Sequence, residues 1–169
     1  AAAVAAEHPE LGSKAILVEP YSGANSEVRK QARQRPSEER GRRAREIRDA
    51  ATPNDLIQAV AEQYEGASED SIRRIAQMWF QMDPALEEGP ISRAEDTETF
   101  DDMFSSIECP TLMIAGAADK GGIMSKEESE RVIGLIPDSR LLTWPKVGHS
   151  PHIARNHDFI RATKRFWTE

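Results

Sequence analysis

Residues 110–119 read Pro-Thr-Leu-Met-Ile-Ala-Gly-Ala-Ala-Asp, and this stretch decides the fold. Its first six residues are an apolar run that predicts a buried strand over residues 110–115. Residues 116–122 are rich in Gly and predict a turn-rich loop. The sequence therefore places the carboxylate of Asp119 just beyond the carboxyl end of a buried strand.

Two further segments predict strands of the same kind. Residues 14–19 read Lys-Ala-Ile-Leu-Val-Glu and are followed by a proline, and residues 139–144 read Ser-Arg-Leu-Leu-Thr-Trp. A helix with a capping box at Ser125 and Glu128 separates the second strand from the third, and a last amphipathic helix begins near Asn156. Strands that alternate with helices predict crossover connections and a parallel sheet.

The pattern is different between residues 21 and 106, where helical periodicity dominates. Thr52 followed by a proline predicts the start of one helix, and Ser68 predicts the start of another. The apolar stripe of the second helix contains Trp79 and Phe80. These two aromatic residues are candidates for lining an apolar substrate pocket, although the same spacing is typical of the interior of a helical subdomain.

The fold class expected from these patterns is α/β, with a partial, doubly wound parallel sheet and an inserted all-helical cap. Residues 1–20 and 107–169 form the core, and residues 21–106 form the cap, which is expected to pack over the carboxyl ends of the strands.

Composition narrows the classes of partner. The formal charge of −7 argues against nucleic acid or an anionic membrane as partner, and no apolar run approaches the length of a membrane helix. Residues 29–48 carry a local charge of +6 (nine Lys or Arg against three Glu), which we interpret as a solvated helix face. The single cysteine, Cys109, excludes an internal disulfide and fits a reducing, cytoplasmic compartment.

In open parallel sheets, ligands bind beyond the carboxyl ends of the strands. Asp119 follows one predicted strand and His149 follows the next, so we expect their loops to lie side by side. An aspartate beside a histidine is the orienting half of a catalytic triad, because the carboxylate fixes the tautomer and stabilises the imidazolium. The structural alternative is that both are ordinary loop residues, since Asp favours turns.

Three stretches resemble the α/β-hydrolase family. Residues 108–119 resemble its strand and acid loop, residues 147–152 (Val-Gly-His-Ser-Pro-His) resemble its histidine loop, and residues 5–20 resemble the helix and strand that follow the nucleophile elbow. The resemblance implies that Asp119 is the catalytic acid and His149 the general base. It also places the nucleophilic serine and the oxyanion donors upstream of Ala1, so that the chain is expected to be inactive without that upstream half of the fold.

The function that the resemblance implies is a serine-type hydrolase, esterase-like, acting on a small, mostly apolar ester, lactone or related carbonyl compound, with no metal or organic cofactor. His152 is a weaker candidate for contact with substrate. Two alternatives stay open. An aspartate at the elbow would give an epoxide or haloalkane hydrolase, and the fold also hosts non-catalytic ligand-binding receptors.

Overall fold

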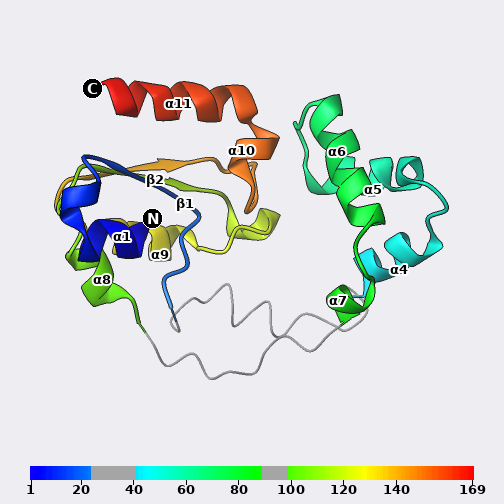
Figure 1. Ribbon diagram of the computed structural model, residues 1–169, viewed down its shortest axis with the longest axis horizontal. Helices are drawn as coiled ribbons and strands as arrows, with labels where there is room; N and C mark the ends of the chain where they lie inside the picture. The colour runs from blue at the N-terminus through cyan, green and yellow to red at the C-terminus, as the bar shows by residue number, and fades with distance from the viewer. Residues whose placement is uncertain (24–40, 89–98) are drawn as a thin grey trace. The chain divides into compact units, whose positions relative to one another are not determined.

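The computed structural model describes residues 1–23, 41–88 and 99–169. Contacts divide the chain into two compact units, Ala1–Arg29 with Glu95–Glu169 and Lys30–Ala94. The first unit holds the sheet, whereas the described residues of the second unit are helices and turns (Figure 1). An isolated antiparallel bridge joins Gly23 to Thr99, two residues of the first unit that flank the segment containing the second unit.

The sheet has three parallel strands in the order β1-β2-β3, which confirms the predicted architecture. The strands are β1 (Ala15–Val18), β2 (Thr111–Ala115) and β3 (Ser139–Thr143). Every residue of the central strand β2 is buried, because helices cover both faces of the sheet. This double cover explains why the strand reads as a continuous apolar run and not as an alternation of apolar and polar residues.

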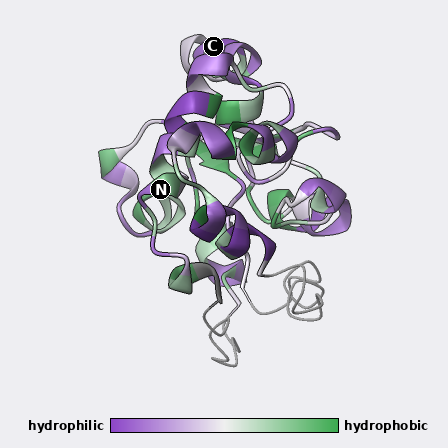
Figure 2. Ribbon diagram, turned by 90° about the vertical axis from the view of Figure 1, so that its right-hand side faces the viewer, coloured by the Kyte–Doolittle hydropathy of each residue, from purple (hydrophilic) through white to green (hydrophobic). Residues whose placement is uncertain are grey.

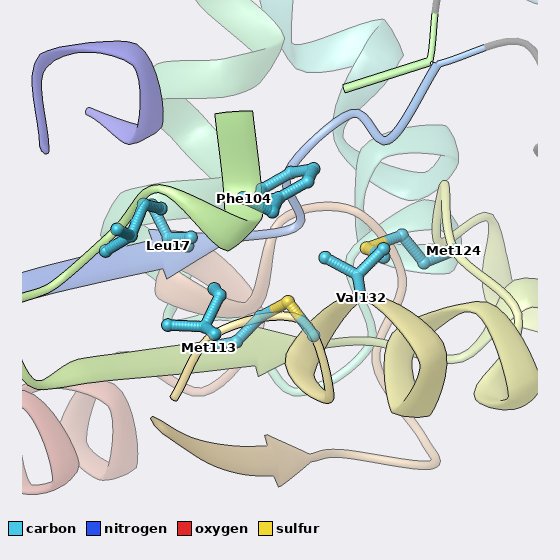
Figure 3. Packing of buried hydrophobic residues seen from close by; sticks show 7 residues of the cluster. Leu17, Phe104, Met113, Met124 and Val132 are labelled. Carbon is cyan, nitrogen blue, oxygen red and sulfur yellow. The ribbon is translucent and has the colours of Figure 1, made fainter. Parts of the chain in front are cut away.

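Helices α1 (Ala2–Glu7), α8 (Asp101–Ser105) and α9 (Lys126–Ile133) cover one face of the sheet, and α10 (Pro151–Ala154) and α11 (Asn156–Thr168) lie on the other (Figure 1). Side chains from β1, β2, α8, α9 and the loop before α9 meet in the first core, as Figure 3 shows. The labelled residues of that core are Leu17, Phe104, Met113, Met124 and Val132. In Figure 2 the apolar colour gathers on the strands, whereas α11 is largely hydrophilic.

Helix α8 belongs to the first unit, although the sequence pattern groups it with the helical cap of residues 21–106. Phe104 is fully buried and packs in the same cluster as Leu17 and Met113. The helical spacing of apolar residues is the same whichever core a helix joins, so periodicity alone does not reveal to which unit a short helix belongs.

The second unit is built from short helices. They are α4 (Arg42–Asp49), the 3₁₀ turn η2 (Pro53–Leu56), α5 (Ile57–Gln63), α6 (Glu69–Phe80) and α7 (Ala85–Glu88). The predicted starts are confirmed: the Thr52 amide donates to the Asp55 carboxylate at 2.8 Å, and the Ser68 hydroxyl accepts from the Ser71 amide at 3.3 Å. Residues 29–40 of the basic stretch lie outside the described residues. No helix in the described ranges is long and apolar enough to cross a membrane.

Helices α8 and α9 are joined by an ion-pair network around Arg131. Its guanidinium makes two hydrogen bonds of 2.9 Å to the nearly buried Glu128 carboxylate and one of 2.8 Å to Asp101. The hydrogen bonds from Arg131 lower the pKa of Glu128 below its ordinary value. A lowered pKa in the folded state stabilises the fold above the unfolded-state value of about 4.5, and this contribution is lost as the pH falls through the folded-state pKa.

We expect Glu128→Gln to lower the free energy of unfolding at pH 7 by about 1–3 kcal/mol, because a charged hydrogen-bonded pair is broken near the core. The same substitution should flatten the loss of stability below about pH 4.5. Urea denaturation at a series of pH values measures both effects. Glu130→Gln is the matched control, since Glu130 pairs with Lys126 at an exposed site and its loss should change little. Equal acid sensitivity of the wild-type protein and the Glu128 variant would contradict the assignment.

Candidate active site

The three parallel strands end at one edge of the sheet, and each is followed by a polar residue or a polar loop. Glu19 follows β1, residues 116–124 connect β2 to α9, and residues 144–150 connect β3 to α10. Asp119 lies in the second segment, in the 3₁₀ turn η3 (Ala118–Lys120), and His149 lies in the third. The predicted adjacency of the Asp119 and His149 loops follows from the parallel pairing of β2 with β3, and Glu19 lies at the same edge because β1 is parallel to β2.

The Asp119 loop and the His149 loop are joined backbone to backbone. The amide of Ala117 donates to the carbonyl of Val147 at 2.6 Å. Two glycines make this close approach possible. A Cβ on Gly116 would lie 2.3 Å from the Gly148 carbonyl oxygen, and a Cβ on Gly148 would lie 2.1 Å from the Lys120 carbonyl oxygen. Side chains at these two positions would push the loops apart.

Asp119 sits in a tight, exposed turn. The amides of Lys120 and Gly122 both donate to the carbonyl of Ala117, at 3.0 and 2.9 Å, and Gly121 adopts the left-handed conformation (φ +88°) that closes the turn. Within the described ranges, the Asp119 carboxylate has no hydrogen bond or ion pair, so none of its oxygens lies within 4.0 Å of a ring nitrogen of His149. The loops are adjacent as expected, and the catalytic role of Asp119 stays a prediction.

His149 has a different carboxylate beside it. Its Nδ1 atom lies 3.6 Å from Oε2 of Glu19, and the imidazole side chain is 57% exposed whereas the Glu19 side chain is fully buried. The same carboxylate accepts two backbone amides, from Gly116 to Oε1 at 2.5 Å and from Ile123 to Oε2 at 2.6 Å. Glu19 therefore holds both ends of the loop that carries Asp119 and also faces the histidine.

The other predicted site residues are dispersed. In the second unit, Trp79 is 7% exposed, with the Arg43 guanidinium 5.1 Å from its ring centre, and the neighbouring Phe80 is 36% exposed. In the first unit, His152 is exposed on α10, with its ring centre 6.0 Å from that of Phe159. The burial of Trp79 fits the structural alternative, an aromatic residue in the interior of the helical unit.

An open groove of about 470 Å³ lies between β3 and α11, and its lining includes the apolar residues Leu142, Trp144 and Phe166 together with four arginines. Glu19, Asp119 and His149 are not among the residues that line it. The described residues contain no group of three or more His, Cys, Asp or Glu side chains that could hold a metal ion. The imidazole of His149 and the carboxylates of Glu19 and Asp119 lie instead at the carboxyl edge of the sheet.

No family model and no curated protein matches the chain. Solved structures of hydrolases are similar to it. The proline iminopeptidase of Mycobacterium smegmatis is 19% identical with a TM-score of 0.59, over 98% of this chain and 60% of that one. E-2-(acetamidomethylene)succinate hydrolase is 13% identical with a TM-score of 0.65, over 99% and 62%. The enol-lactonase of Burkholderia xenovorans LB400 is 18% identical with a TM-score of 0.54, over 99% and 61%.

These structures share the α/β-hydrolase fold, so the fold class predicted from the sequence is confirmed. At this level of identity the likeness concerns the fold and not the chemistry. The chain spans about three fifths of the length of the solved structures that it matches.

Proposed function

We propose that this chain carries the acid–base part of a serine-type hydrolase for a small, mostly apolar ester, lactone or related carbonyl substrate. The observation that carries the proposal is the backbone pairing of the Asp119 and His149 loops at the carboxyl edge of a parallel sheet, with a carboxylate 3.6 Å from His149 Nδ1. The hydrolase fold of the similar structures supports it, and their greater length leaves room for a segment that carries the nucleophile.

In the proposed reaction, the serine of that segment attacks the carbonyl carbon while Nε2 of His149 takes the hydroxyl proton. The proton passes to the departing alcohol as the bond between carbonyl carbon and leaving oxygen breaks. His149 then removes a proton from water, which attacks the acyl-enzyme, and the same proton passes from His149 to the serine oxygen as the acyl–serine bond breaks, so that the acid and the free serine are released. A carboxylate on the Nδ1 side keeps the tautomer that leaves Nε2 free to accept the proton, and Asp119 is the residue proposed for this role from the sequence.

Hydrolysis of p-nitrophenyl acetate and butyrate tests the proposal. The 169-residue chain alone should show no turnover, whereas the chain joined to the nucleophile-bearing segment, or mixed with it, should hydrolyse one or both esters. In that complete protein, Asp119→Asn should lower kcat by at most about 10⁴-fold with little change in KM, because it disturbs the tautomer and not substrate binding. Binding of small apolar ligands without turnover of any ester, lactone or epoxide would favour a receptor over an enzyme.

A further inference from the structure

We propose that Glu19 is a positioning residue that orients the imidazole of His149 through its Nδ1 atom. The inference rests on the proposed role of His149 as the general base. The sequence pattern gives the orientation of this imidazole to Asp119, in the loop after β2. The inference gives it to Glu19, which directly follows β1.

A carboxylate that orients a histidine has to be held in a fixed position, and the Glu19 carboxylate is held in this way. Its side chain is fully buried, and its two oxygens accept the amides of Gly116 and Ile123. Amide donors at both oxygens fix the direction of the carboxylate. The imidazole is more than half exposed and is therefore the partner that can adjust. A small rotation about its side-chain bonds would shorten the 3.6 Å separation to a hydrogen bond, as commonly happens when substrate binds.

The backbone of Glu19 gives a second, independent argument. Its φ is +47°, and among the described residues no other non-glycine residue has a positive φ. This backbone conformation is strained for a residue with a side chain, and it persists where surrounding contacts impose it, most often at functional sites. Here the Glu19 amide still donates to Ile114 at the end of β2, at 2.8 Å, while the side chain turns inward toward the two amides.

Asp119 satisfies these requirements less well in the same structure. It is exposed and has no hydrogen bond within the described residues, so water screens its charge and its side chain can rotate. Glu19 also acts on Asp119 indirectly, since the amides it holds, at residues 116 and 123, bracket the turn that carries Asp119. We therefore expect Glu19 to matter for catalysis even if Asp119 approaches His149 when substrate binds.

The test uses the complete protein and compares Glu19→Gln with two reference variants. Glu19→Gln should lower kcat by about 10²-fold or more with little change in KM, because base orientation and not substrate binding is lost. Glu128→Gln is the matched control: it also removes a nearly buried, hydrogen-bonded carboxylate of the first unit, but one that pairs with Arg131, and kcat should not change. His149→Ala shows separately whether the turnover depends on the histidine at all.

A spectroscopic measurement separates orientation from mere structural support. With ¹⁵N-labelled histidine, neutral His149 should carry its proton on Nδ1, and protonated His149 should show a low-field Nδ1 proton resonance that Glu19→Gln abolishes and Glu128→Gln preserves. The wild-type tautomer can be observed even if Glu19→Gln fails to fold.

Three results would overturn the inference: a proton on Nε2 in the wild-type protein, a resonance unchanged in Glu19→Gln, or a kcat of Glu19→Gln within about threefold of wild type while His149→Ala is inactive. If His149→Ala keeps full activity, the proposed function fails instead. In that case the tautomer and the Nδ1 proton resonance alone decide whether Glu19 orients the imidazole of His149.

Discussion

His149→Ala is expected to lower kcat for ester hydrolysis by at least about 10³-fold in the complete protein, because the serine then has no base to take its proton. KM should change little, since the imidazole acts on the nucleophile and not on substrate binding. The effect is measured as the steady-state rate of p-nitrophenyl butyrate hydrolysis at saturating substrate, after subtraction of the rate without enzyme. His149 is exposed, so the substitution should leave the melting temperature nearly unchanged.

His157→Ala is the matched control, because His157 is an exposed histidine of α11 on the same unit. It should keep the wild-type rate. If both histidine variants retain full activity, the turnover does not use His149, and the role of general base would have to be assigned to another residue.

Gly148→Ala is expected to destabilise the first unit by about 1–3 kcal/mol. The added Cβ would lie 2.1 Å from the Lys120 carbonyl oxygen, and a backbone atom cannot be displaced by a simple side-chain rotation. The Asp119 and His149 loops would have to separate, so kcat should fall together with stability. Urea denaturation and the ester assay measure the two effects on the same sample.

Gly12→Ala is the control for Gly148→Ala. Gly12 has an extended backbone, and a Cβ there would lie 3.9 Å from the Lys14 carbonyl oxygen, an ordinary contact. Its substitution should change stability by less than about 1 kcal/mol, with stabilisation the expected sign, because Ala restricts the unfolded chain. If the two variants are equally stable, the loops are not packed as closely as described.

The sequence predicts the sheet well because buried parallel strands leave a strong local signal. The runs around Leu17, Met113 and Leu141 are apolar and bounded by prolines and turn residues, and these three residues lie side by side in the sheet. Helix starts at Ser68 and Ser125 are equally local, since the capping hydroxyl and the amide it accepts are three residues apart. Such features need no knowledge of the rest of the fold.

The environment of His149 could not be predicted in the same way. Glu19 is 130 residues from His149 in the sequence, and a glutamate at the end of a strand resembles any solvent-facing residue until its burial is known. The one signal was positional: Glu19, like Asp119 and His149, follows the carboxyl end of a strand. The sequence motif predicts the pair Asp119 and His149, whereas in the structure Glu19 faces the imidazole.

The bridge between Gly23 and Thr99 makes the fold tolerant of changes in the length of the segment between these two residues. The bridge holds the two ends of this segment side by side. Its length can therefore change at little cost in loop-closure entropy and without shifting the register between β1 and β2. Tyr21 and Phe100, whose ring centres are 5.7 Å apart, reinforce the same junction. The intervening segment can therefore change in length while the strands that hold Glu19 and the loop that holds His149 keep their register.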